Sequence, residues 1–374
     1  MADLSKDTDI VVVKIGSSTL VDEAGAVDRA FIADLCEQVI GLRSIGKRVV
    51  IVSSGAAAAG MERLGFDRRP SDMPSLQACA ACGQAALTEV YATVLARHGI
   101  ACGQVLLTRR DVIDREGYLN ARNTLERLLD LGVVPVVNEN DTVSVAEFAF
   151  GDNDMLGAIV ATLIGADLYV IMSDIDGLYT DNPATNPQAT RIDRVERVDA
   201  EVMEMAGGAG SAVGTGGMVT KLRAARALLA AGIPTVICRG RQPGVLGDVV
   251  AGRSVGTRFE PPLGWSHESP RKFWIGLAEV PQGTLTLDEG ACAAVIKRGA
   301  SVLPVGVIGT EGTYSAGDVV NVVTPQGTLI GRGTVRYSSD EMVRVRGLKL
   351  DVIARFMPEK EGQPAIHRDE LLVF

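Results

Sequence analysis

Short apolar runs alternate with stretches of helical periodicity over the first two thirds of the chain. Runs such as IVVVKI and LYVIM end at Gly, Ser or Asp residues, which is typical of strands buried on both faces. Apolar residues spaced three or four apart between these runs predict amphipathic helices. The predicted strands are residues 10–15, 49–52, 105–107, 133–137, 168–172 and 235–238, and the predicted helices are 28–42, 75–97, 120–131, 155–164 and 217–231. This alternation predicts an α/β fold with a mainly parallel open sheet sandwiched by helices.

Polar segments follow four of the predicted strands directly. They are residues 16–18, 53–55, 138–141 and 173–174. The carboxyl ends of parallel strands meet at one edge of a sheet, where ligands bind in open α/β folds. A further polar cluster, residues 152–154, opens a predicted helix, and we expect all of these segments to share one ligand site. Residues 143–150 alternate as in an exposed ribbon.

The pattern changes after Arg258. The stretch EPPLG at 260–264 is typical of a linker, and short β-like runs separated by glycines follow it. The β-like runs are 302–308, 319–323, 331–336 and 342–345, and the helical candidate is 287–297 with Asp288 as its N-cap. These runs predict a small C-terminal β-barrel with a partly mobile tail at 357–374. The predicted boundaries are 1–262 for the first domain, 263–272 for the linker and 273–374 for the β-rich domain with its tail.

Composition and charge limit the classes of function. Aromatic residues make up only 4% of the chain, so small apolar side chains must fill a core of closely packed helices and sheet. The net charge of −9 argues against a general polyanion-binding protein, although a local ATP site needs only a few cations. We expect no membrane span and a cytoplasmic protein, because no apolar run reaches ~20 residues and the N-terminus lacks a hydrophobic signal region.

The six cysteines lie mostly in apolar patterns, as buried thiols do in a reducing compartment. Cys79 and Cys82 match a CxxC motif, but they lie inside an Ala-rich helix, and no second pair or histidine cluster accompanies them. Buried small side chains are therefore a better interpretation than a metal or redox site.

Two lysines occupy unusual positions. Lys14 lies inside an apolar strand, where a buried charge is costly unless an anion neutralises it. Lys221 lies in the first turn of a helix that follows the glycine-rich segment 214–217, and a cation there opposes the helix dipole unless it faces an anion. The alternatives are a solvent-facing edge lysine for Lys14 and an ordinary surface lysine for Lys221. Neither segment is a Walker A loop.

The acidic clusters have structural alternatives too. Residues 152–154 include good N-cap residues, and Asp174 and Asp176 could be turn formers before Gly177. Their joint position at one sheet edge favours a polar ligand site. The histidines, His98, His267 and His367, fall outside every cluster, which disfavours a Ser–His–Asp hydrolase and a histidine metal site. Lysines with carboxylates suit phosphoryl transfer, which depends on positioning and charge neutralisation.

Taken in order, these motifs resemble the amino-acid kinase family, in its branch with a C-terminal PUA domain. The matching segments are VVVKIGSS, IVSSGAAAAG, VVNENDTVS, FGDNDMLGA, SDIDGLYT and GTGGMVTK. The resemblance implies a phosphotransferase that moves the γ-phosphoryl group of ATP, with Mg²⁺, to the side-chain carboxylate of L-glutamate. The product would be L-glutamyl 5-phosphate, the first intermediate of proline biosynthesis. It also implies proline as a feedback inhibitor and a homo-oligomer.

The resemblance also assigns roles to residues. Lys14 and Lys221 would stabilise the transferring phosphoryl group, and Asp154 would hold both lysines. Ser54, Asp141 and Asn153 would bind glutamate. The ATP-binding residues would be Lys14, Ser173, Asp174, Thr215, Gly216, Gly217, Met218, Val219, Thr220 and Lys221. No metal site of the protein's own is expected, since Mg²⁺ would lie on the ATP phosphates.

Two alternatives stay open at this point. The first is another kinase of the same fold that forms an acyl phosphate, such as one acting on acetylglutamate. The second is an RNA-binding regulator built on an inactive kinase fold, because PUA domains occur in RNA-modifying proteins. Residues 263–374 hold 12 Lys and Arg against 13 Asp and Glu, so the usual basic footprint of RNA binding is absent from this segment.

Overall fold

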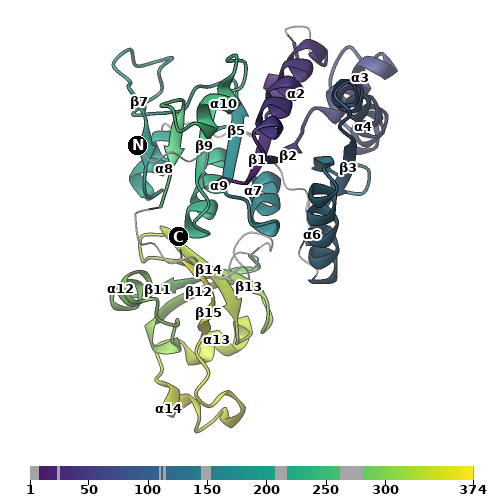
Figure 1. Ribbon diagram of the computed structural model, residues 1–374. Coiled ribbons are helices and arrows are strands. Elements are labelled where there is room, and N and C mark those ends of the chain that lie inside the picture. Colours follow the sequence, from purple (N-terminus) through teal and green to yellow (C-terminus); the bar gives the residue numbers. More distant parts are fainter. Residues whose placement is uncertain are drawn as a thin grey trace. The chain divides into compact units, whose positions relative to one another are not determined.

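The computed structural model describes residues 8–22, 26–108, 111–112, 115–144, 153–206, 217–261 and 281–373. The chain separates into two compact units, Met1–Trp265 and Ser266–Phe374. Each unit has a sheet of its own (Figure 1).

The first unit is built on an eight-stranded sheet with the order β3-β4-β2-β1-β5-β9-β10-β8. Its strands are β1 (Ile10–Ile15), β2 (Arg48–Val52), β3 (Cys102–Leu107), β4 (Val134–Glu139), β5 (Leu168–Ser173), β8 (Arg194–Val195), β9 (Thr235–Arg239) and β10 (Thr257–Phe259). The first six strands of that order are parallel to their neighbours, and β10 runs antiparallel to β9. The predicted mainly parallel sheet is confirmed. A two-stranded hairpin, β6 (Leu178–Tyr179) and β7 (Arg191–Ile192), lies outside it.

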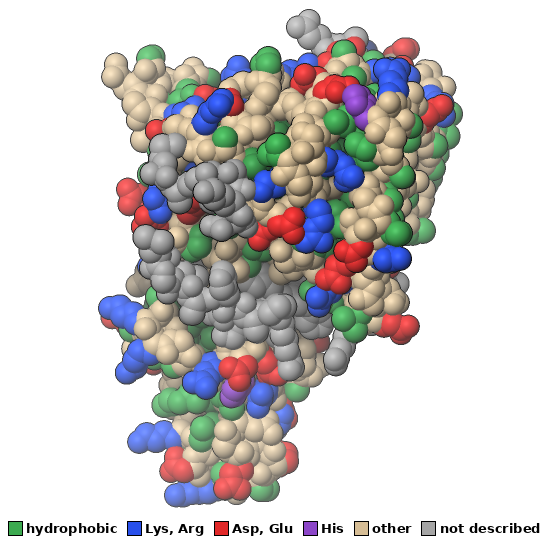
Figure 2. All heavy atoms as spheres, in the orientation of Figure 1, with side chains coloured by type: hydrophobic (Ala, Val, Ile, Leu, Met, Phe, Trp, Pro, Cys, Tyr) green, Lys and Arg blue, Asp and Glu red, His purple; other side chains and the backbone are tan. Residues whose placement is uncertain are grey.

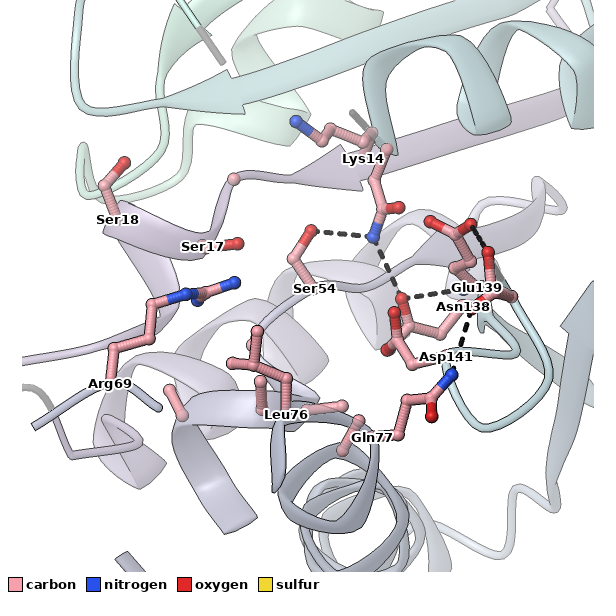
Figure 3. Close-up of a pocket in the computed structure, with 18 of the residues that line it drawn as sticks. Lys14, Ser17, Ser18, Ser54, Arg69, Leu76, Gln77, Asn138, Glu139 and Asp141 are labelled. Atoms are coloured by element: carbon pink, nitrogen blue, oxygen red, sulfur yellow. Dashed lines mark hydrogen bonds between the residues drawn. The ribbon is translucent and has the colours of Figure 1, made fainter. Parts of the chain in front are cut away.

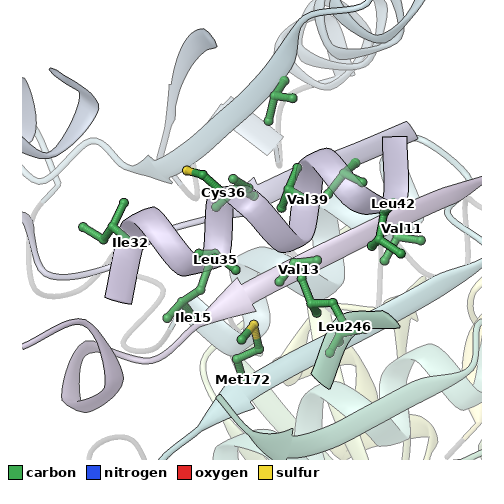
Figure 4. Close-up of a cluster of buried hydrophobic side chains, with 14 of the residues drawn as sticks. Val11, Val13, Ile15, Ile32, Leu35, Cys36, Val39, Leu42, Met172 and Leu246 are labelled. Carbon is green, nitrogen blue, oxygen red and sulfur yellow. The ribbon is translucent and has the colours of Figure 1, made fainter. Parts of the chain in front are cut away.

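Helices cover both faces of this sheet. They are α1 (Ser17–Leu20), α2 (Arg29–Ser44), α3 (Ala56–Leu64), α4 (Met73–Ala96), α6 (Arg115–Asp130), α7 (Asn153–Leu163), α8 (Ala200–Ala206), α9 (Met218–Ala230) and α10 (Val245–Val250). Helices α2, α4 and α10 share one core cluster with the sheet (Figure 4). Helices α6, α7 and α9 pack against the other face.

Alternation along β1 decides which side chains face which layer. Val11, Val13 and Ile15 pack into the core cluster with α2, as Figure 4 shows. Strand β1 is buried along its whole length, which confirms the prediction of a strand covered on both faces. Because successive side chains point to opposite faces, Lys14 lies on the α7 side of the sheet.

Glycines allow α3 and α4 to pack backbone to backbone. A Cβ on Gly60 would lie 1.7 Å from the carbonyl oxygen of Cys79, and one on Gly83 would lie 1.8 Å from that of Ala56. Helix α4 is long and apolar enough to cross a membrane by length and composition, although no run of that kind was expected from the sequence. Half of its apolar window is buried inside the protein, as in the core helix of a globular unit. Cys79 is buried, but Cys82 is exposed, so the prediction of buried thiols fails for Cys82.

The second unit holds a five-stranded sheet with the order β12-β11-β13-β14-β15. Its elements are β11 (Gly283–Leu287), α12 (Glu289–Arg298), η1 (Pro304–Gly306), β12 (Val307–Gly312), β13 (Val319–Val323), β14 (Leu329–Val335), α13 (Ser339–Val345), α14 (Leu350–Ile353), η2 (Pro358–Lys360) and β15 (Ile366–Val373). The predicted N-cap of α12 is confirmed, because the Asp288 carboxylate accepts a hydrogen bond from the Ala291 backbone N–H at 2.7 Å.

Three predictions for this unit are wrong. Residues 342–345 belong to helix α13, which Ser338 and Glu341 start with a reciprocal capping box. Most of 302–308 is not a strand: Val302 forms an isolated bridge, η1 follows, and β12 begins only at Val307. The tail expected to be partly mobile contains β15, which pairs with β14 and contributes Ile366 and Leu371 to the core.

Candidate active site

Strands β4, β2, β1 and β5 are parallel neighbours, so their carboxyl ends meet at one edge. This confirms the edge predicted from the four polar segments. A cavity of about 610 Å³ opens there (Figure 3). The predicted site residues that line it are Lys14, Ser54, Asp141, Asn153, Ser173, Asp174 and Lys221.

The strand ends differ slightly from the prediction. Asn138 and Glu139 were expected in a turn, but they are the last two residues of β4, because they pair with Leu106 and Leu107 of β3. Ser173 likewise closes β5. Of the ribbon predicted at 143–150, Val143 lies in a turn, and residues 145–150 fall outside the described residues.

Asp154 connects the two predicted lysines. It lies in the first turn of α7, where the helix dipole favours a carboxylate. Its Oδ1 pairs with the Lys14 ammonium group, and its Oδ2 lies 3.3 Å from Lys221 Nζ and accepts a hydrogen bond from the Thr220 hydroxyl at 3.0 Å. The exposed fractions are 3% for Lys14, 0% for Asp154 and 5% for Lys221. One buried carboxylate therefore holds two buried ammonium groups, and the cluster keeps a net positive charge that faces the cavity.

Tyr169 fixes the start of α7 from the sheet. Its hydroxyl donates to the backbone carbonyl of Asp154 at 2.9 Å. A Cβ on Gly157 would lie 2.2 Å from that hydroxyl, so a glycine is needed for the ring to reach the helix. The position of Asp154 is thus set by its helix and by β5 together.

Asn153 is the central residue of a neighbouring hydrogen-bond network. Its Nδ2 lies 2.6 Å from the Ser53 carbonyl, 2.9 Å from the Ser54 hydroxyl and 2.9 Å from Asn138 Oδ1. Asn138 in turn donates from Nδ2 to Gln84 Oε1 on α4 at 2.8 Å. This network joins the ends of β2 and β4 to α7 at the wall of the cavity.

Charged side chains of both signs also line the cavity. Asp141 follows β4, with Glu139 beside it, and Arg69 lies in the segment between α3 and α4. The pKa of Asp141 is raised to about 6, mainly by burial and secondly by the negative charge of Glu139, while the Arg69 guanidinium opposes the rise. The Glu139 carboxylate accepts a hydrogen bond from Ser144 at 2.7 Å.

The remaining predicted residues that the structure describes lie near the end of β5 and the start of α9. The Ser173 hydroxyl donates to Asp174 Oδ1 at 2.9 Å. Gly217 is the N-cap residue of α9, and Met218, Val219 and Thr220 form its first turn without lining the cavity. Thr215 and Gly216 fall outside the described residues. Asp176 accepts a hydrogen bond from Tyr179 at 3.1 Å and lies 3.7 Å from Arg191, which fits the structural alternative for that residue.

Several cavity residues escaped the sequence prediction. Arg69 lies in an exposed polar stretch without periodicity, and Gln77 lies on a helix whose pattern marks only its apolar side. Helix α3 was missed entirely, although Ala56, which opens it, follows Gly55 directly at the cavity wall. In the described residues, no group of three or more His, Cys, Asp or Glu side chains could hold a metal ion. The two described histidines pair at the surface, His98 with Glu37 and His367 with Asp369.

The fold and the site define a class of protein. The model of the "Amino acid kinase family" matches residues 9–239, and that of the "PUA domain" matches residues 283–357. The chain belongs to the amino acid kinase family. It is similar to two curated proteins named glutamate 5-kinase. The one from Trichlorobacter lovleyi is 44% identical over 363 residues, or 97% of this chain and 96% of the relative. The one from Geobacter sulfurreducens is 45% identical over 363 residues, or 97% of each chain.

A solved structure shares the fold. Carbamate kinase from Giardia lamblia bound to AMP-PNP matches 69% of this chain and 100% of its own, with a TM-score of 0.50 and 16% sequence identity. This likeness concerns the fold alone.

Proposed function

We propose that the protein is an ATP-dependent kinase that phosphorylates the side-chain carboxylate of L-glutamate. The product is L-glutamyl 5-phosphate, the first intermediate of proline biosynthesis. The observation that carries the proposal is the buried pair of lysines on Asp154, in a cavity that is also lined by an acid, Asp141, and a guanidinium, Arg69. The similarity to glutamate 5-kinases over 97% of the chain supports the same substrate.

The reaction needs no general base. A glutamate side chain has a reference pKa of ~4.3, so its carboxylate is already ionised at neutral pH. One carboxylate oxygen attacks the γ-phosphorus, a new P–O bond forms, and the bond to the β-phosphate oxygen breaks to release ADP. Because no proton has to be removed from the acceptor, a site without histidine is chemically sufficient.

The lysines neutralise the charge of the transferring group. Lys14 comes from β1 and Lys221 from α9, and Asp154 holds both ammonium groups before ATP binds. Preorganised charges of this kind stabilise a transition state without reorganisation during the reaction. The backbone N–H groups of Ser17 and Ser18 and the start of α9 lie at the same edge, where phosphate groups bind well.

Mg²⁺ would accompany the nucleotide. The carboxylate of Asp154 is already occupied by two ammonium groups, and the described residues include no acidic cluster for a metal. Mg²⁺ usually keeps several waters and binds through phosphates with few protein ligands, which fits this set of donors. When bound, it would supply further charge neutralisation on the phosphate oxygens.

Measuring ADP release separates this function from its alternatives. With ATP and Mg²⁺, we expect release that depends on L-glutamate. Stimulation by acetylglutamate instead would select a different acceptor within the same fold. No turnover with any carboxylate, together with salt-sensitive RNA binding, would select a regulator. Acidic and basic side chains are interspersed on the part of the second unit that Figure 2 shows, which does not resemble a basic RNA-binding surface.

Replacing Asp141 with alanine should chiefly raise the KM for glutamate. A carboxylate that binds the substrate ammonium group contributes about 1.5–3 kcal/mol, so the KM should rise ~10- to 100-fold with little change in kcat. Initial-rate kinetics in both substrates measure this, with Asp34→Ala, an exposed acid on α2, as the control. A change confined to the KM for ATP would show that Asp141 contacts ATP rather than glutamate.

The pH dependence of kcat/KM for glutamate offers an independent check. The pKa of Asp141 is raised to about 6 by burial first and by Glu139 second. Binding of an ammonium group requires the ionised carboxylate, so kcat/KM should be full above this pKa and fall as the pH drops through it. The measurement is a profile from pH 5 to 8 compared with that of Asp141→Asn. Ionisation of ATP affects both proteins equally, so identical profiles would contradict the assignment.

The family resemblance supports further parts of this proposal. The enzyme would act in the cytoplasm as a homo-oligomer, and proline would inhibit it as the end product. Sedimentation velocity and inhibition kinetics with L-proline test these two properties directly.

A further inference from the structure

Two charged side chains of opposite sign, Asp141 and Arg69, line the cavity and do not bond to each other. Within the described residues, neither Asp141 nor Arg69 makes a hydrogen bond or a salt bridge, although both line the same cavity. Arg69 enters from the α3–α4 segment, and Figure 3 shows its guanidinium pointing into the cavity across from Asp141. The two are near enough for the guanidinium to lower the pKa of the Asp141 carboxyl.

An α-amino acid fits between such groups. Its ammonium and carboxylate groups are attached to one carbon, so they need an anion and a cation on opposite sides of that carbon. Asp141 and Glu139 can only accept hydrogen bonds when ionised, and therefore suit the ammonium group. The amide donors nearby are already used, since Asn153 donates within the central network and Gln77 donates to the Ser144 carbonyl at 3.1 Å.

We propose that Arg69 binds the α-carboxylate of the acceptor and selects an α-amino acid over an amine that lacks this carboxylate. This inference rests on the proposed function and assigns one end of the substrate to a residue outside the matching motifs. With the α-carbon held by Arg69 and Asp141, the side-chain carboxylate extends toward Ser54 and Lys14, where the phosphoryl group arrives. A guanidinium can bind a carboxylate through two parallel N–H···O hydrogen bonds, which also fix the orientation of the carboxylate.

A contact with the ATP phosphates is the competing role for Arg69, because Figure 3 shows its side chain near Ser17. The observations favour the amino-acid end. The Arg69 guanidinium points into the cavity across from Asp141, whereas Lys14 and Lys221 form a separate cluster with Asp154. The kinetics below separate the two roles.

The experiment compares Arg69→Ala and Arg69→Lys with the wild type and with Arg68→Ala. Arg68 is the adjacent exposed arginine and does not line the cavity, so it controls for local charge. For Arg69→Ala we expect the KM for L-glutamate to rise ~10- to 100-fold. The KM for ATP and the kcat at saturating glutamate should stay within about threefold of the wild type. The KM of the lysine variant should be intermediate, since lysine keeps the positive charge but lacks the planar guanidinium that can form two parallel hydrogen bonds.

Two acceptor analogues localise the effect. Glutarate lacks the α-amino group and keeps both carboxylates, whereas 4-aminobutanoate lacks the α-carboxylate. As inhibitors competing with glutamate, glutarate should bind at least ~10-fold more weakly to Arg69→Ala than to the wild type, and 4-aminobutanoate should bind both proteins equally. Thermal unfolding should show wild-type stability, because Arg69 is exposed.

The outcomes distinguish this inference from the function on which it rests. A wild-type protein without glutamate-dependent ADP release overturns the proposed function. An active wild type with an unchanged glutamate KM in Arg69→Ala overturns only the role of Arg69. A raised KM for ATP or a lowered kcat assigns Arg69 to the phosphates instead, and equal weakening of both analogues also refutes the α-carboxylate contact.

Discussion

Lys221→Ala should lower the kcat for glutamate phosphorylation by ~10²-fold or more. Removing one preorganised charge contact from a transition state costs about 2.7–4 kcal/mol, and the side chain of this lysine is only 5% exposed. The loss should appear in kcat and in kcat/KM alike, because the lysine stabilises the phosphoryl group most strongly while it is in transfer between the two oxygens. Initial rates of ADP release at saturating ATP and glutamate measure it.

The matched control for this change is Arg223→Ala. Arg223 lies two residues further along α9, but its side chain is exposed, so it carries the same charge on the same helix without reaching the cavity. We expect wild-type kcat from the control. Asp154 keeps Lys14 and Thr220 as partners in the Lys221 variant, so unfolding temperatures should stay close to that of the wild type. An unchanged kcat in Lys221→Ala would remove this lysine from the mechanism.

The charged cluster was predictable because its residues break a local rule. Lys14 interrupts a strand that is otherwise apolar on both faces, and Lys221 places a cation where the helix dipole disfavours one. Each misplacement needs an anion elsewhere in the fold, and the parallel topology specifies the edge at which that anion must lie. The structure shows Asp154 as the shared partner of both lysines.

Other cavity residues break no rule that can be read along the chain. Arg69 is one of two adjacent arginines in an exposed segment, and only the tertiary path of that segment brings one of them to the cavity. Gln84 contacts Asn138 from within an Ala-rich helix, where a single glutamine does not indicate a buried polar contact. Contacts of this kind depend on the packing of α3 and α4 against the sheet, which no local pattern encodes.

The errors in the second unit have local causes. The sequence Met342-Val-Arg-Val alternates as a strand does, but the capping signal at Ser338 and Glu341 lies just before it and selects a helix. Strand β15 was not predicted because a polar stretch precedes Ile366. Its partner β14 lies some 30 residues earlier in the chain. Strand pairing at such a separation is decided by the fold rather than by neighbouring residues.

Asp154→Asn should cost both activity and stability. Asp154 is fully buried and is the carboxylate between two buried ammonium groups, so its neutralisation leaves two positive charges without their shared anion. Breaking a buried pair from one side typically costs about 3–5 kcal/mol, which corresponds to a fall in unfolding temperature of roughly 6–20 °C for a unit of this size. The kcat should fall ~10³-fold, because the lysines lose the group that positions them.

Glu201→Gln separates this effect from the loss of a helix-dipole contact. Glu201 also lies in the first turn of its helix, α8, but it is exposed, so the change removes a comparable charge from a comparable position without unpairing a lysine. Its unfolding temperature should move by no more than about 4 °C, since an exposed dipole contact contributes only about 0.3–1 kcal/mol. Differential scanning calorimetry of both variants, with kinetics on the same samples, gives the comparison. Equal shifts in the two variants would mean that Asp154 serves only the start of α7. A large stability loss with wild-type kcat would mean that the Lys14–Asp154–Lys221 cluster only stabilises the fold. The phosphoryl group would then bind elsewhere in the cavity.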